Sequence, residues 1–112
     1  LEDSEAEIFV AENDGELVGF AEAALRKYAD GCESSPVGYL EGWYVRPEYR
    51  KHGVGRQLVE AVEDWAWEKG CTELASDTEL HNLLSQQAHA KLGFEEVERI
   101  VQFRKALVES RG

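Results

Sequence analysis

Six consecutive residues, Arg50-Lys51-His52-Gly53-Val54-Gly55, combine positive charge with two closely spaced glycines just before a segment of helical spacing. A helix start has unpaired N–H groups and the positive end of the helix dipole, and glycine lets an anion approach the backbone. The loop therefore suits an anion with several oxygens, such as a pyrophosphate. It lacks the Gly-Lys-Ser/Thr ending of a P-loop and the spacing of a dinucleotide fingerprint. An ordinary Gly-rich turn is the alternative, and the surrounding bases favour the anion.

A second candidate is Glu41, a carboxylate inside an otherwise aromatic and aliphatic segment. Such a carboxylate must be solvated, paired with a cation or donor, or used in binding or catalysis. Strand alternation predicts Glu41 on one face with Tyr39 and Trp43, and Leu40 on the other. Rings beside a carboxylate can hold an ammonium group together, so we predict a cation-binding wall. A place at a strand edge would also explain the charge.

These residues need a scaffold, and the chain predicts the order β-β-β-α-β-α-β. Strands at residues 7–11 and 17–21, the second extending toward residue 28, are joined by the turn Asn13-Asp14-Gly15. A loop at 30–36 precedes a central strand at 37–45. A helix of about 16 residues starts at Val54, and a strand at 71–76 runs parallel to the central one. A second helix at 80–92 and a last strand at 97–107 follow.

Length and composition limit the possible functions. The 112 residues, 43% hydrophobic, fit a single domain spanning 1–112. Twelve Lys and Arg against 23 Asp and Glu give a net charge of −11, which disfavours nucleic acid and favours cationic partners. Two cysteines predict neither a disulfide scaffold nor a cysteine-based zinc site. No apolar run approaches the roughly 18 residues of a membrane span, so we expect a cytoplasmic protein without membrane contact.

The sequence around the glycine loop resembles a known family. Residues 45–55 (VRPEYRKHGVG) resemble the acetyl-CoA signature of the GNAT superfamily of N-acetyltransferases, and residues 82–94 (NLLSQQAHAKLGF) resemble its later helix. Within it, Glu41-Gly42-Trp43-Tyr44-Val45 and Ala75-Ser76-Asp77 are most similar to aminoglycoside 6′-N-acetyltransferases. The resemblance implies an α+β fold with a GNAT-like mixed sheet. It also implies that a first strand and two helices of the family, which would precede Glu7, are absent from this chain.

The resemblance also implies site residues. Those expected to bind the co-substrate acetyl-CoA are Tyr44, Val45, Arg50, Lys51, His52, Gly53, Val54, Gly55, Arg56 and Asn82. Those expected to hold the acceptor are Tyr39, Glu41, Trp43 and Asp77, and those expected to act in catalysis are Glu41, His89 and Asp77. Asp77 has an alternative as N-cap of the following helix, and His89 as an ordinary helix-face histidine. No metal is expected.

The implied reaction is direct transfer of an acetyl group from acetyl-CoA to a primary amine in a ternary complex, most specifically the 6′-amine of an aminoglycoside antibiotic. Glu41 would receive the amine proton, a backbone N–H of Tyr44 or Val45 would polarise the carbonyl, and His89 would protonate the departing sulfur. We also expect a homodimer. Alternatives are another polyamine or a protein amine as acceptor, a non-catalytic acetyl-CoA sensor, and a domain that binds nothing small.

Overall fold

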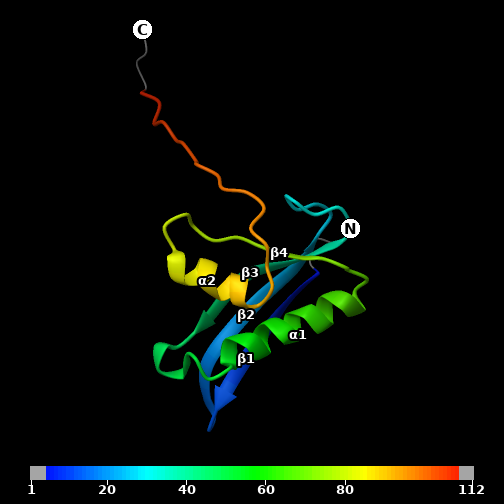
Figure 1. Ribbon diagram of the computed structural model, residues 1–112, viewed down its shortest axis with the longest axis vertical. Coiled ribbons are helices and arrows are strands. Elements are labelled where there is room, and N and C mark those ends of the chain that lie inside the picture. Colours follow the sequence, from blue (N-terminus) through cyan, green and yellow to red (C-terminus); the bar gives the residue numbers. More distant parts are fainter. Residues whose placement is uncertain (1–4, 109–112) are drawn as a thin grey trace.

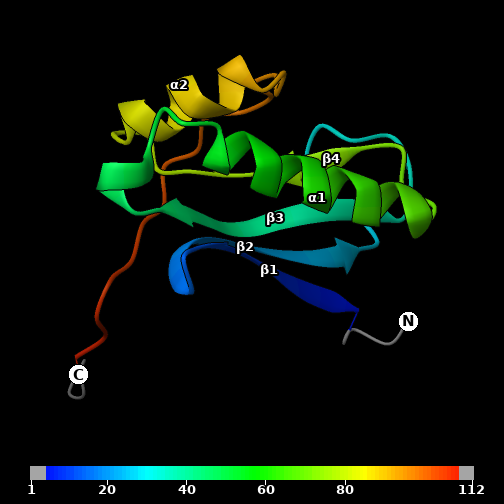
Figure 2. The same cartoon turned by 90° about the horizontal axis from the view of Figure 1, so that it is seen from below.

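The computed structural model describes residues 5–108, which form one four-stranded sheet with two helices on the same side (Figure 1, Figure 2). The strands are β1 (Ala6–Asn13), β2 (Glu16–Arg26), β3 (Val37–Val45) and β4 (Leu74–Ser76), in that spatial order. The first three pair antiparallel, and β4 runs parallel to β3. The helices are α1 (Val54–Glu68) and α2 (Leu83–Lys91), with a short 3-10 turn, η1 (Pro47–Tyr49), after β3. The mixed α+β sheet is as predicted.

The first hairpin turns where the sequence predicts it. Asp14 and Gly15 both adopt positive φ, 53° and 82°, as a tight turn between twisted antiparallel strands requires. The first strand is longer than predicted, and β2 ends at Arg26, short of the predicted extension toward residue 28. That length places Arg26 opposite Val37, at the start of β3.

Helix α1 covers the sheet with its apolar face. Its buried residues Leu58, Val59 and Val62 form one core cluster with residues of β2 and β3. At Gly38 a Cβ would lie 2.8 Å from the Cβ of Ala66, so the missing side chain permits this close approach of α1 to β3. Residue 54, the predicted helix start, is the observed one.

A β-bulge interrupts the β2–β3 ladder at Glu41. Glu22 lies opposite Gly42 and Ala23 opposite Leu40, so Glu41 is the extra residue of the bulge. The extra residue reverses the alternation of faces. Leu40 and Trp43 therefore both pack with the α1 core cluster, whereas Tyr39 belongs to a separate cluster. The prediction that Tyr39 and Trp43 share a face is wrong for this reason.

The predicted last strand at 97–107 is also wrong. Residues 95–108 form no regular secondary structure, and they run away from the sheet as an extended segment (Figure 1). The large apolar side chains of this C-terminal segment are exposed, Phe103 by 91%. An alternating apolar pattern indicates an apolar face that must be buried. It does not specify the neighbouring strand with which residues 97–107 would pair.

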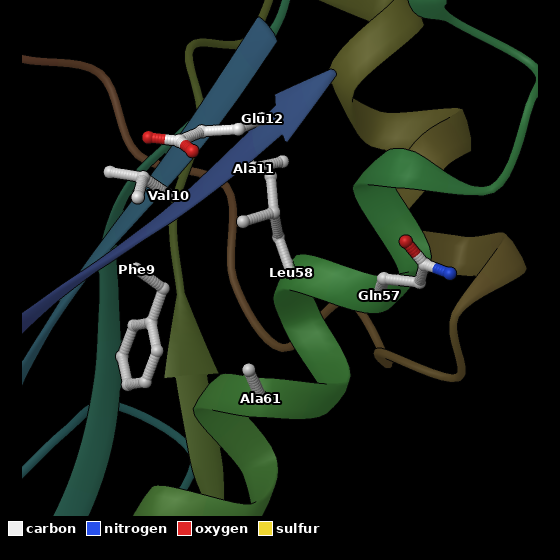
Figure 3. Close-up of a pocket in the computed structure, with 7 residues that line it drawn as sticks. All are labelled: Phe9, Val10, Ala11, Glu12, Gln57, Leu58 and Ala61. Atoms are coloured by element: carbon white, nitrogen blue, oxygen red, sulfur yellow. The ribbon is translucent and has the colours of Figure 1, made fainter. Parts of the chain in front are cut away.

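A groove of about 300 Å³ lies between β1 and α1. Figure 3 shows its lining: Phe9, Val10, Ala11, Glu12, Gln57, Leu58 and Ala61. None of the predicted site residues lines this groove. Among residues 5–108, no helix is long and apolar enough to cross a membrane.

Candidate functional site

The loop before α1 has the backbone form that an anion site needs. Lys51 and Gly53 have φ of 67° and 86°, so the chain curls twice through the left-handed region just before the helix. Lys51, His52 and Gly53 are exposed, and no side chain in the described part of the chain caps the N-terminus of α1. The first amide groups of α1 and the positive end of its dipole thus face an accessible loop.

Arg50 braces this loop against β3. Its Nε donates a hydrogen bond to the carbonyl oxygen of Val45 at 2.7 Å, and its guanidinium lies 5.5 Å from the centre of the Tyr44 ring. Tyr44 also packs beside Phe20, with ring centres 6.1 Å apart. A coenzyme that pairs with the backbone of Val45 would therefore share that carbonyl with Arg50.

A second pocket, of about 190 Å³, opens where β3 and β4 separate. The two strands pair only at Gly38–Leu40 and Leu74–Ser76, and beyond these positions they leave a fork that α2 borders. We call this the fork pocket. Its lining residues are Leu40, Glu41, Gly42, Trp43, Ser76, Asp77, Thr78, Asn82, Ser85 and His89. The structure thus brings together five predicted site residues, Glu41, Trp43, Asp77, Asn82 and His89, whereas Tyr39 and Tyr44 lie outside the lining.

Trp43 connects the fork pocket to the glycine loop. Its indole Nε1 donates to the carbonyl oxygen of Gly55 at 3.2 Å, and its ring centre lies 5.3 Å from that of His89. A Cβ at Gly55 would lie 3.3 Å from the indole, so glycine there leaves room for the ring. A single molecule with an anionic end and a reactive end could span both places.

Glu41 is already engaged with a cation of the same chain. Arg26 binds the two carboxylate oxygens of Glu41, through Nη2 at 2.8 and 3.0 Å and through Nε at 3.1 Å. The guanidinium carbon also lies 3.5 Å from the centre of the Tyr39 ring. The combination of ring and carboxylate that we predicted for a substrate ammonium therefore exists, and it holds Arg26. Sequence reasoning missed Arg26 as the partner of Glu41, because the two residues lie 15 positions apart and Lys27 is an equivalent base beside Arg26.

Tyr39 and Asp77 form the second polar pair near the fork pocket. The Tyr39 hydroxyl donates to Oδ2 of Asp77 at 2.5 Å. Burial, together with this hydrogen bond to Asp77, raises the pKa of Tyr39 to about 12. Tyr39 is therefore a neutral donor at physiological pH, and its phenol fixes one oxygen of Asp77.

The alternative role of Asp77 as a helix cap is wrong. Helix α2 starts at Leu83, later than predicted, and its N-cap is Asn82, whose Oδ1 accepts from the backbone N–H of Ser85 at 3.0 Å. Asn82 therefore uses its side-chain oxygen for the helix, which leaves its amide hydrogens for any ligand contact.

His89 is held on several sides. Its Nε2 lies 2.9 Å from Oγ of Ser76, and its Nδ1 lies 2.8 Å from the backbone oxygen of Ser85. The rings of Trp43 and Phe94 pack against it edge-on. Sequence reasoning missed Ser76 as a partner, although it belongs to the quoted Ala-Ser-Asp motif, because nothing in the sequence indicated its distance from His89.

Other reactive groups do not compete for this site. Burial raises the pKa of the Cys71 thiol, which disfavours its nucleophilic thiolate form. Within residues 5–108, no group of three or more His, Cys, Asp or Glu side chains is placed to hold a metal ion. The polar chemistry available is that of carboxylates, an imidazole, hydroxyls and backbone amides.

Comparison with known proteins agrees with this geometry. A sequence profile of the acetyltransferase (GNAT) family matches residues 1–94. The chain belongs to the GNAT acetyltransferase family. Within this family, it is 52% identical over 112 residues to an aminoglycoside N(6′)-acetyltransferase type 1 of Stenotrophomonas maltophilia, covering 98% of this chain and 73% of that protein. An enzyme of the same name from Salmonella typhimurium is 51% identical over 98 residues, covering 87% of this chain and 68% of that protein.

Solved GNAT structures share the fold. AAC(6′)-Iy in complex with the bisubstrate analogue CoA-S-monomethyl-acetylneamine superimposes with a TM-score of 0.86 at 48% identity, covering 93% of this chain and 71% of that chain. The apo aminoglycoside 6′-N-acetyltransferase AAC(6′)-IG from Acinetobacter haemolyticus gives 0.85 at 42% identity, with 94% and 73% covered. The GNAT fold predicted from the sequence is therefore confirmed.

Proposed function

We propose that this chain is an aminoglycoside 6′-N-acetyltransferase, which transfers an acetyl group from acetyl-CoA directly to the 6′-amine of the drug. The single observation that carries the proposal is the close similarity to enzymes of that name over most of the chain. A neighbour at 48% identity was solved with an analogue that joins coenzyme A to an aminoglycoside. The net charge of −11 supports a polycationic acceptor.

The glycine loop and the fork pocket suit the two ends of the coenzyme. The exposed, left-handed backbone at Lys51 and Gly53 presents the start of α1 to the pyrophosphate. Trp43 links this loop to the fork pocket, which would receive the thioester. The bulge at Glu41 supports this assignment, because bulges bend a strand out of its ladder next to active sites.

Acetyl transfer needs a neutral amine, an oriented carbonyl and a proton for the departing sulfur. In this proposal Glu41 receives the amine proton, directly or through a water, once the acceptor has entered beside Arg26. Backbone N–H groups of Tyr44 or Val45 polarise the carbonyl. His89 is the source of the proton for the sulfur, and Asp77, oriented by Tyr39, binds a further ammonium of the acceptor.

The test of this function is Glu41→Gln, which keeps the shape of the side chain and removes its charge. We expect the specificity constant for tobramycin to fall at least about tenfold, the equivalent of 1.4 kcal/mol, with unchanged acetyl-CoA affinity. Steady-state kinetics and calorimetry measure the two quantities.

Glu41→Gln leaves Arg26 without its ion-pair partner, so the double variant Arg26→Gln/Glu41→Gln is the matched control that removes both charges. If the double variant recovers full activity, the loss in the single variant came from the unpaired guanidinium of Arg26. Release of thiol from acetyl-CoA only with protein amines, and never with tobramycin, would contradict the drug assignment. Binding of acetyl-CoA without any transfer would indicate a sensor.

We also propose a homodimer that works in the cytoplasm. The exposed apolar side chains of the C-terminal segment, which include Val101 and Phe103, support a partner surface. The unpaired cysteines, Cys32 and Cys71, are compatible with a reducing compartment.

A further inference from the structure

Both nitrogens of the His89 ring already have hydrogen-bond partners. Nδ1 lies 2.8 Å from the backbone oxygen of Ser85, and a carbonyl oxygen can only accept. Nδ1 therefore carries a proton. In the neutral ring, Nε2 then has a lone pair, and the Ser76 hydroxyl at 2.9 Å must donate to it. His89 thus has no ring nitrogen directed at a free ligand atom, and Ser76 stands on its reactive side.

The Ser76 hydroxyl has a second acceptor, because its Oγ also lies 3.2 Å from the carbonyl oxygen of Leu40. A hydroxyl has a single hydrogen, so Nε2 of His89 and the Leu40 oxygen compete for it. When His89 gains a second proton, Nε2–H becomes a donor to Oγ, and the hydroxyl hydrogen must turn elsewhere. Ser76 and Leu40 form the last pair of the β3–β4 ladder, and both line the fork pocket. The hydroxyl hydrogen is then held by the neutral Leu40 carbonyl, and a developing thiolate in that pocket can compete for it, because a charged acceptor binds a hydrogen more strongly.

We propose that Ser76 is the catalytic acid of the reaction and that His89 supplies it with a proton. This inference rests on the proposed acetyl transfer. As the carbon–sulfur bond of the tetrahedral intermediate breaks, the sulfur takes its electron pair and receives the hydrogen of the Ser76 hydroxyl. In the same step Oγ takes the Nε2 hydrogen of protonated His89, which becomes neutral with its hydrogen on Nδ1. Glu41, which took the proton released by the amine, gives it up to solvent, and solvent reprotonates His89 for the next turnover, so one proton is lost and one gained in each cycle.

A different use of the same pair must be distinguished. A serine hydroxyl that donates to a histidine, which is itself held by a carbonyl, could act as a nucleophile and carry the acetyl group. The proposed transfer of a proton from His89 through Ser76, here called the relay, and the nucleophilic role predict different covalent states of Ser76. The relay leaves Ser76 unmodified throughout, whereas a nucleophile forms an acetyl ester on Oγ.

The test compares Ser76→Ala, Ser76→Thr and Ser85→Ala. We expect Ser76→Ala to lower kcat for tobramycin by roughly 10²-fold, with unchanged KM for acetyl-CoA, because an acid is lost and binding is not. Ser76→Thr restores a hydroxyl and should recover most of kcat. Ser85→Ala removes a hydroxyl 3.4 Å from Nδ1 but keeps the carbonyl that holds the ring, so its loss should be much smaller.

Three results would overturn the relay: full kcat in Ser76→Ala, equal losses in the alanine and threonine variants, or a mass increase of one acetyl group on the Ser76 peptide after incubation with acetyl-CoA. A readout independent of turnover is the ¹⁵N NMR spectrum of the imidazole. We expect the Nδ1–H tautomer in the parent and a shifted Nε2 resonance in Ser76→Ala. A neutral ring protonated at Nε2 would overturn the relay even if the protein acetylates no drug. A parent that acetylates other amines but not tobramycin would instead contradict only the proposed acceptor.

Discussion

Glu41, which lines the fork pocket, is paired with Arg26, a cation of the same chain. A guanidinium that binds both carboxylate oxygens and lies over an aromatic ring occupies the place that we propose for the ammonium of an acceptor. Both partners are about two-fifths exposed, 42% and 36%, so water and salt weaken the pair. Exposed pairs of this kind contribute at most about 1 kcal/mol. Such a contact can be displaced by a multiply charged ligand.

We predict that Arg26→Gln strengthens acceptor binding. Removal of the competing cation should lower KM for tobramycin by up to roughly fivefold, the equivalent of 1 kcal/mol, and change the free energy of unfolding by less than about 1 kcal/mol. Arg46→Gln is the control, because Arg46 pairs with Glu16 and Glu48, and none of the three lines the fork pocket. A higher KM in Arg26→Gln would mean that Arg26 holds Glu41 in its binding geometry instead of competing for it.

At the scale of elements, the start of α1 and the bulge in β3 are the two features that shape the candidate site. The helix start depends on the left-handed residue Gly53, and the bulge decides which side chains of β3 meet α1 and which meet Arg26. Both are local departures from regular geometry, and each places backbone or side-chain groups where a regular element could not.

Gly53→Val tests the role of the helix start. A Cβ there meets no atom within 4 Å, so the substitution acts through φ alone and should cost about 1–2 kcal/mol of unfolding free energy. We expect it also to weaken acetyl-CoA binding by more than about tenfold, because the backbone of the anion loop moves.

Gly70→Val is a matched control for this experiment. Gly70 has φ of 92°, equally open surroundings, and a position just beyond the other end of α1. It should lose similar stability with no change in acetyl-CoA affinity. Calorimetric titration and urea denaturation measure the two effects, and equal affinity losses in both variants would remove the anion loop from cofactor binding.

Considered as a whole, the molecule is more extended than a packed chain of its length. Its radius of gyration is 16.8 Å and its longest extent 62 Å, whereas a compact domain of this size has a radius of about 13 Å. The C-terminal segment accounts for the difference, since it leaves the sheet beyond α2 (Figure 2). Its exposed side chains include Val97, Ile100, Val101, Phe103, Leu107 and Val108.

We predict that a second copy of the chain covers this segment. Sedimentation equilibrium should give a dimer, and Val101→Asp/Phe103→Asp should shift it to monomer, because two charges would enter an apolar contact. Gln102→Asp/Arg104→Asp, on neighbouring exposed positions, adds the same side chains without removing apolar ones and should shift the equilibrium less. A monomeric parent at micromolar concentration would contradict the prediction.

The sequence allowed prediction of those parts of the molecule that local patterns determine. The turn at Asp14-Gly15, the start of α1 at Val54 and the strand around Leu40 follow from glycine positions and apolar spacing. The partners of Glu41 and His89 could not be predicted, because a bulge changes the phase of a strand and a contact between distant residues leaves no local pattern. The strand expected at 97–107 failed for a related reason, since its apolar alternation identifies a surface and not the neighbour that covers it.

The edge-on contact between Trp43 and His89 has an optical consequence. Indole emission is quenched more strongly by a charged imidazole than by a neutral one, and the two ring centres are 5.3 Å apart. Of the three tryptophans, Trp65 lies beside Phe9 and Trp67 is largely exposed, so replacing both with phenylalanine would leave the indole of Trp43 in the fork pocket as the single tryptophan. The emission of Trp43 would therefore report changes at His89 during coenzyme loading and turnover without any added label.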